Sequence, residues 1–228
     1  LSPSHLLTSQ AQTVASPNGK VSVMLELTDQ GKPCYRVQYD GQEVVRPSAL
    51  GIRTNIGDFT QGLTLKGVEQ HPVSDAYDLR NIKQGHVNYE ATEAVASYVN
   101  KQGKELLDII FRVSDRDVAF RYKIYPQRDT RVCVVEGEAS DFVLPDGTTT
   151  FLCPQSKPMG GFARTSPSYE TSYTLDDVMG KNSWGEGYTF PCLFKVSGDS
   201  GSSGLSGKPG KSRNIPDATL WVLISETG

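Results

Sequence analysis

Apolar and polar residues alternate along much of this chain, and the alternation is clearest between Leu107 and Tyr125. Every second residue from 107 to 113 is apolar, and the same holds from 118 to 124. The polar stretch Ser114–Asp117 separates the two runs. A period of two on both sides of a turn predicts an antiparallel hairpin with one buried face.

The same alternation predicts short strands along the rest of the chain, and no segment keeps a helical period over ten residues. The stretch from Gly51 to Gly85 is less regular, and Asp75–Asn81 is compatible with one helical turn. Short strands at turn-punctuated spacing predict an all-β fold, a large antiparallel sandwich rather than an α/β domain. The further predicted strands are Val21–Leu27, Tyr35–Tyr39, Val44–Val45, Val87–Val99, Val132–Glu138, Phe142–Leu144, Thr149–Cys153, Tyr169–Thr174, Tyr188–Val196 and Leu220–Ile224.

The length of 228 residues suits one large all-β domain or two small domains. Because the predicted strands favour one large sandwich, residues 1–228 are predicted to form a single domain. Ser197–Arg213 is rich in glycine and serine and predicts a long flexible loop between two apolar strands. The chain starts at Leu1 and stops just after an apolar run. We therefore expect a piece of a longer protein from which any export signal has been removed.

Composition excludes two classes of function. The net charge is −3 and the isoelectric point about 5.7, so no basic field is available to bind nucleic acid. No apolar run approaches the length of a membrane span, about 18 residues. The four cysteines, Cys34, Cys133, Cys153 and Cys192, permit two disulfides, but their positions in apolar runs favour buried free thiols.

The segment Arg164–Thr174 is dense in hydroxyl and aromatic side chains. In a strand, Glu170 shares a face with Ser168, Ser172 and Thr174. A carboxylate among hydroxyl groups suits a hard cation that binds oxygen, such as Ca²⁺. The alternative is a carboxylate on a solvated outer face.

Four other residues are candidates for chemistry, each with a plainer alternative. Glu226 follows an apolar strand, where a carboxylate either lines a site or is a surface charge. His71 and His86 lie in the irregular region near Glu90 and suggest acid–base chemistry or simply surface histidines. Trp184, in a glycine-rich loop, either stacks on a sugar ring or fills the core.

Three stretches taken together resemble a known family. SPNGKVSVMLEL followed by CYRVQYDGQEVVRPSALGI resembles the start of the N-terminal domain of glycoside hydrolase family 97. LDIIFRVSDRDVAFRYKIYP is similar to a hairpin of that domain. SYETSYT, YTFPCLFKV and LWVLISETG resemble its closing strands.

The resemblance implies an exo-acting α-glucosidase or α-galactosidase, often periplasmic. It implies an N-terminal β-supersandwich similar to galactose mutarotase, a catalytic (β/α)₈ barrel and a C-terminal β-domain. It also implies an active-site Ca²⁺ that takes one glutamate from the N-terminal domain. By motif position that glutamate is Glu170, with Glu226 as second choice, while the catalytic residues lie in the barrel and have no counterpart here.

The sequence therefore predicts a non-catalytic N-terminal domain of a family 97 α-glycosidase. Its partners are the enzyme's own barrel and α-linked glucosides or galactosides. One alternative is a free-standing carbohydrate-binding module that uses Trp184 and Tyr169 as a stacking platform. Another is a mutarotase-like enzyme with His71 or His86 as acid and a glutamate as base.

Overall fold

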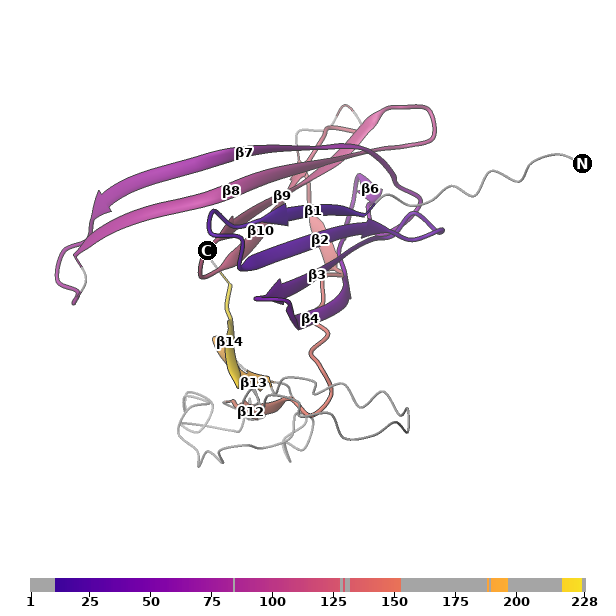
Figure 1. Cartoon of the computed structure of the whole chain (residues 1–228). Helices are drawn as coiled ribbons and strands as arrows, with labels where there is room; N and C mark the ends of the chain where they lie inside the picture. Colours follow the sequence, from indigo (N-terminus) through magenta and orange to yellow (C-terminus); the bar gives the residue numbers. More distant parts are fainter. Residues whose placement is uncertain are drawn as a thin grey trace, which may run out of the picture. The chain divides into compact units, whose positions relative to one another are not determined.

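The computed structural model describes residues 11–83, 85–127, 129, 132–152, 188, 190–196 and 219–226. It divides into two compact units, residues 1–143 and 144–228 (Figure 1). The prediction of a single domain over 1–228 stays a prediction. All elements among the described residues are β-strands, and the strand pairs that they form are antiparallel, which confirms the all-β prediction.

The first sheet of unit 1 is a meander in the order β1-β2-β3-β4. Its strands are β1 (Gln12–Ala15), β2 (Val21–Leu27), β3 (Pro33–Tyr39) and β4 (Gln42–Ala49). Burial alternates along β2 and β3, as the sequence pattern predicts. On the outer face, Arg36 forms an ion pair of 2.9 Å with Glu26 of the neighbouring strand.

The second sheet has the order β10-β9-β8-β7. Its strands are β7 (Thr64–Asp78), β8 (His86–Val99), β9 (Glu105–Ser114) and β10 (Val118–Ile124). The hairpin predicted between Leu107 and Tyr125 is confirmed as β9–β10, paired from Leu107–Ile124 to Val113–Val118. The hydroxyl of Ser114 stabilises its turn by accepting hydrogen bonds from the main-chain N–H groups of Arg116 and Asp117.

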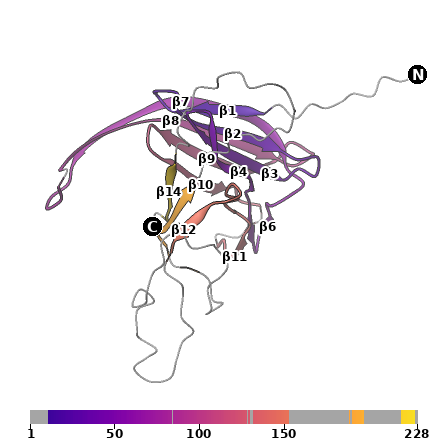
Figure 2. The ribbon, with the colours of Figure 1, turned by 60° about the horizontal axis from the view of Figure 1, so that its bottom comes forward.

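The core of unit 1 lies between these two sheets (Figure 2). The tyrosine ring of Tyr35 on β3 lies 6.0 Å from the ring of Phe111 on β9 and 5.7 Å from that of Phe120 on β10. Burial of apolar surface at about 25 cal/mol per Å² drives this packing. The fully buried side chains of unit 1 include Val14, Val23, Leu25, Leu50, Phe59, Tyr98, Leu107, Ile109, Phe111 and Val113.

The stretch between Gly51 and Gly85 is more regular than the sequence predicts. It contains β5 (Ile52–Thr54), β6 (Gly57–Asp58) and the whole of β7. The helical turn at Asp75–Asn81 is wrong, because Asp75–Asp78 pair with β8 along a continuous ladder. That ladder satisfies the backbone N–H and C=O groups that a single helical turn would leave open.

A third, small sheet joins β5 and β6 to β11 (Val135–Glu138), in the order β11-β5-β6. The strand predicted at Phe142–Leu144 is wrong. Val143 instead donates its N–H to the hydroxyl of Ser48 at 2.9 Å and accepts from the N–H of Arg46 at 2.7 Å. A side-chain acceptor therefore interrupts the ladder at this point.

Unit 2 contains a three-stranded sheet in the order β12-β13-β14. Its strands are β12 (Thr149–Phe151), β13 (Cys192–Val196) and β14 (Leu220–Ile224). The strand predicted at Leu220–Ile224 is confirmed. One face of the sheet holds a buried cluster of Leu152, Cys192, Phe194 and Ile224, against which Leu144, Tyr188 and Val222 pack. The predicted strand Tyr169–Thr174 and the loop Ser197–Arg213 lie outside the described residues.

Three cysteines belong to the described residues, and all three are free thiols. Cys192 is buried and Cys34 partly buried, but Cys133 is exposed. The prediction of buried thiols is therefore wrong for Cys133, which precedes β11 at the margin of the small sheet. Among the residues that the structure describes, no helix is long and apolar enough to cross a membrane.

Candidate functional site

Three predicted site residues, Tyr169, Glu170 and Trp184, lie outside the described residues. Glu226 lies within them, exposed and two residues beyond the end of β14. In the described parts of the chain, no group of three or more His, Cys, Asp or Glu side chains could hold a metal ion. Glu226 therefore has no described carboxylate cluster around it.

His71 lies in a row of charged side chains on the outer face of the second sheet. Its Nε2 lies 3.2 Å from Oε1 of Glu93 on β8, and Oε2 of Glu93 accepts a 2.6 Å hydrogen bond from Nε of Arg112 on β9. The register aligns the three residues across three strands. Sequence analysis identified His71 but missed Glu93, which stands between the buried Ala91 and Ala94 and is grouped with His71 and Arg112 only by strand pairing.

Glu93 is a structural carboxylate rather than a general base. Only 9% of the residue is exposed. The hydrogen bond from Arg112 lowers the pKa of Glu93 against the opposing effect of burial, and the charges of Arg112, His71 and Arg121 lower it further. A carboxylate that is held ionised is a weak proton acceptor. The row is therefore suited to fixing strand register, not to the proton transfer that a mutarotase-like reaction requires.

His86 is exposed at the start of β8. Its Nδ1 lies 2.8 Å from Oδ1 of Asp78 on β7, and its Nε2 lies 3.0 Å from Oδ1 of Asn88. These contacts tie the two strands of the hairpin together near its tip. His71 and His86 thus belong to two separate polar contacts, and the structure does not bring them together.

A second carboxylate that sequence analysis missed is Asp108 on β9, which is 3% exposed. Its Oδ2 accepts hydrogen bonds from the Tyr125 hydroxyl at 2.7 Å and from Nζ of Lys123 at 3.0 Å. Burial alone would raise the pKa of Asp108, but hydrogen bonds from Tyr125, Ser97 and Lys123 hold it below its ordinary value. The signal in the sequence is a lone aspartate within an apolar run, Leu106–Phe111.

The sheet of unit 2 also carries apolar side chains on the face opposite its buried cluster. Phe151, Leu193 and Leu223 form one cross-strand row, and Trp221 lies beside them. Trp221 is 51% and Leu223 62% exposed. Sequence analysis considered Trp184 and Tyr169 for contacts with sugar and missed Trp221, because the uninterrupted run LWVLI predicts burial on both faces rather than an exposed indole.

The antiparallel sheets, with an apolar core between the first two of them, define an all-β sandwich class. The sequence matches the family described as Glycosyl-hydrolase 97 N-terminal over residues 14–205. The chain therefore belongs to the family of N-terminal domains of glycosyl hydrolase 97, and the family predicted from the sequence is confirmed.

One relative with a curated description is a probable retaining alpha-galactosidase of Streptomyces bingchenggensis (strain BCW-1). It is 33% identical over 144 residues, which are 61% of this chain and 22% of that protein. The crystal structure of a beta-arabinopyranosidase is 41% identical and has a TM-score of 0.79, covering 96% of this chain and 32% of that one. The chain thus spans a third or less of the length of these relatives.

A glycoside hydrolase family 97 enzyme from Pseudoalteromonas sp. strain K8, in complex with acarbose, is a more distant structural neighbour. The identity is 18% and the TM-score 0.64, over 81% of this chain and 27% of that one. At this identity the likeness concerns the fold alone. Together these neighbours confirm the predicted β-supersandwich.

Proposed function

We propose that this chain is the non-catalytic N-terminal domain of a family 97 glycosidase and packs on the catalytic barrel of that enzyme. The family match over residues 14–205 is the observation that carries this proposal. The chain corresponds to 32% of the beta-arabinopyranosidase and 22% of the probable alpha-galactosidase, so most of each relative lies outside the aligned part. Residues 1–228 alone are then expected to hydrolyse no aryl glycoside, and measurable turnover by the purified chain would contradict the proposal.

The substrate of the parent enzyme is proposed to have the galacto configuration. Two relatives above 30% identity are described as a probable retaining alpha-galactosidase and a beta-arabinopyranosidase. A β-L-arabinopyranoside has the ring configuration of an α-D-galactopyranoside without the exocyclic CH₂OH group. The full-length enzyme is therefore expected to prefer nitrophenyl α-galactoside or β-arabinopyranoside over α-glucoside. A preference for the glucoside would contradict this part of the proposal.

Glu170 is proposed to supply one oxygen ligand to a Ca²⁺ ion in the active site of the parent enzyme. The donor set in its segment fits this ion, because Glu170 and the hydroxyls of Ser168, Ser172 and Thr174 are all oxygen donors. Ca²⁺ takes six to eight oxygen ligands, so this segment alone is expected to bind it weakly. When bound, the ion would polarise the substrate or orient water as a Lewis acid.

The test is Glu170→Gln in the full-length enzyme, with Glu226→Gln as the matched comparison. Mutation of a residue that only supports a metal ligand typically lowers metal affinity by about 10–100-fold. Loss of a ligand itself is therefore expected to weaken Ca²⁺ affinity at least about tenfold. Titration with Ca²⁺ by calorimetry reads affinity separately from turnover. Unchanged affinity in Glu170→Gln with a loss in Glu226→Gln would move the ligand to the second residue.

A periplasmic location is proposed on the same resemblance and is tested by cell fractionation.

A further inference from the structure

The strands β7 and β8 continue well past the other strands of unit 1 as a two-stranded ribbon (Figures 1 and 2). The last residue of β8 that pairs with β9 is Ala91, opposite Ser114. Residues 74–78 and 86–90 pair only with each other, and the turn 79–85 joins them. At about 3.3 Å per residue, this overhang is roughly 17 Å long before its turn. We call residues 73–91 the arm.

The phase of the apolar alternation changes where the arm begins. Within the sandwich, the core face of β8 carries Ala94, Ala96 and Tyr98, all at even positions. In the arm, the apolar residues of β8 are Val87, Tyr89 and Ala91, all at odd positions. The ladder between β7 and β8 has no register shift from Gly67 to Asp78. The apolar side of the arm is therefore the side turned away from the core face of the sandwich.

Cross-strand pairing makes the arm two-faced. Its apolar face carries Val73 and Tyr77 of β7, Val87 and Tyr89 of β8, and Leu79 at the turn, with Asp75 as its one charged residue. Tyr77 and Leu79 are each 44% exposed. The opposite face is polar and exposed, with the pairs Ser74–Glu90, Ala76–Asn88 and Asp78–His86.

A solvated arm of this kind would be poorly stable by itself. An isolated two-stranded hairpin is marginal in water and needs a third strand or a packed face. Residues 74–78 and 86–90 have no third strand. Exposed tyrosine and leucine side chains on one face of a ribbon mark an interaction surface. The apolar face of the arm is therefore a candidate surface for contact with a partner.

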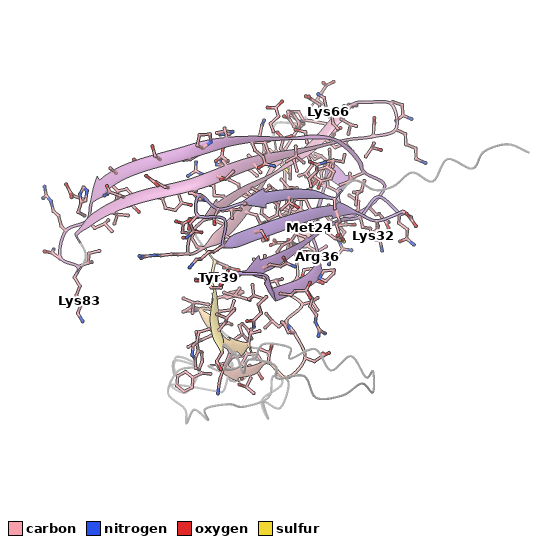
Figure 3. The ribbon with its side chains drawn as sticks, in the orientation of Figure 1. Met24, Lys32, Arg36, Tyr39, Lys66 and Lys83 are labelled. Carbon is pink, nitrogen blue, oxygen red and sulfur yellow. The ribbon has the colours of Figure 1, made fainter. Side chains whose placement is uncertain are left out.

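The tip and the edge of the arm constrain what that partner is. Arg80 and Lys83 are exposed, and Figure 3 shows Lys83 at the end of the arm. Among the described residues neither has an ion-pair partner. Two free cations beside Leu79 and Ile82 fit an apolar surface with carboxylates at its rim. Pro72 on the edge strand β7 removes a main-chain donor and opposes edge-to-edge pairing with a second copy.

We propose that the apolar face and cationic tip of the arm dock on the catalytic portion of the parent enzyme. The exposed cations Arg80 and Lys83 call for a complementary surface that carries carboxylates. In the relatives a partner region of sufficient size is available, because about two-thirds of the beta-arabinopyranosidase lies beyond the part that this chain matches. The inference rests on the proposed function and adds the surface through which the domain contacts the catalytic portion.

Limited trypsin digestion tests this directly, because Arg80 and Lys83 are themselves cleavage sites. Mass spectrometry would compare cleavage after both residues in residues 1–228 and in the full-length enzyme. Cleavage is expected to be at least tenfold slower in the full-length enzyme. Cleavage after Lys101, in the turn between β8 and β9, gives a reference rate in each sample. Equal normalised rates at Arg80 and Lys83 in the two proteins overturn the proposal.

A pair of variants in the full-length enzyme separates the apolar face from the polar face. Tyr77→Ser with Leu79→Ser is expected to restore cleavage to the rate of the isolated chain. Ala76→Ser with Asn88→Ser, a neighbouring cross-strand pair on the polar face of the arm, is expected to leave the arm protected. Restored cleavage in both variants, or in neither, overturns the assignment of the apolar face. Circular dichroism of both variants of the isolated chain shows whether the sandwich is retained.

The digestion also distinguishes protection of the arm by a second copy of the chain from protection by the catalytic portion. If the isolated chain were protected at high concentration and cleaved on dilution, with a dimer mass by light scattering, a second copy would be the partner and the proposal would fail. The readout is proteolysis rather than activity. Loss of the Glu170 assignment therefore leaves this test intact, and failure of this test leaves the calcium proposal standing.

Discussion

The carboxylate of Glu93 on β8 accepts a 2.6 Å hydrogen bond from Nε of Arg112 on the neighbouring strand β9. The same carboxylate lies 3.2 Å from His71 on β7, so one buried side chain joins three strands on the outer face of the sheet. Glu93 is directly beside Ala94, where the core face of β8 begins. The contact therefore holds the register at the point where the arm leaves the sandwich.

The first prediction concerns the pH dependence of this contact. The pKa of Glu93 is lowered below its ordinary value of 4.5, mainly by the hydrogen bond from Arg112. A carboxyl whose pKa falls on folding stabilises the fold fully above its unfolded pKa, and this contribution disappears as pH falls through the folded pKa. Glu93→Gln, measured by urea unfolding, is expected to cost about 1–3 kcal/mol at neutral pH and less at about pH 3.

Glu90→Gln is the matched control for that experiment, because Glu90 is an exposed carboxylate on the same strand. Its substitution is expected to change the free energy of unfolding by no more than about 0.5 kcal/mol. A loss in Glu93→Gln that is equally large at both pH values would show that the ionised carboxylate is not what stabilises the sheet.

The second prediction concerns Asp108, whose buried carboxylate accepts from Tyr125 and Lys123. Asp108→Asn keeps the shape but removes the charge, and it is expected to destabilise unit 1 by about 1–3 kcal/mol. Tyr125→Phe removes a single donor and is expected to cost less, about 1 kcal/mol. Chemical denaturation measures both. The idea fails if Asp108→Asn is no worse than Asp29→Asn, a substitution in an exposed turn.

The third prediction compares two glycines with positive φ. A Cβ on Gly31, at φ +68°, would lie 2.5 Å from the main-chain oxygen of Leu63, whereas a Cβ on Gly19, at φ +74°, would meet nothing within 4 Å. Both alanine variants incur the left-handed backbone cost of about 1 kcal/mol, and Gly31→Ala adds about 1–3 kcal/mol of overpacking. The midpoint temperature of thermal unfolding is expected to be clearly lower for Gly31→Ala than for Gly19→Ala. Equal midpoints would disprove the close approach.

The fourth prediction concerns the thiols. Burial raises the pKa of the Cys192 thiol, which lowers the fraction of reactive thiolate, whereas Cys133 is exposed. Alkylation of the native protein is expected to be at least about tenfold slower at Cys192 than at Cys133, because Cys192 also requires local opening. Peptide mapping after timed iodoacetamide treatment measures both rates, and similar rates would contradict the buried cluster of unit 2.

Alternation predicted strands best where one face is buried and the other is solvated. The β9–β10 hairpin and β2 follow this rule, so their strands and parity could be read directly from the sequence. β7 does not follow this rule, whereas Val87–Val99 was predicted as a strand although the apolar phase of β8 reverses at residues 91–94. Gly51–Gly85 was predicted to be less regular, because no residue of β7 is fully buried and its apolar positions therefore follow no single face.

The candidate site shows the same limit. Glu93, Asp108 and Arg112 could not be grouped from the sequence, because cross-strand neighbours are far apart along the chain and only the register brings them together. The metal ligand proposed at Glu170 is not tested by the described residues, and it stays a prediction from motif position.

The sequence by itself determined the all-β class, the parity of the sandwich strands and the family, because all three depend on local order along the chain. The tertiary structure decided which charges meet and where the arm departs from the sandwich. Those features depend on strand register and on which face finds a partner, and these are settled by contacts between residues distant in the sequence.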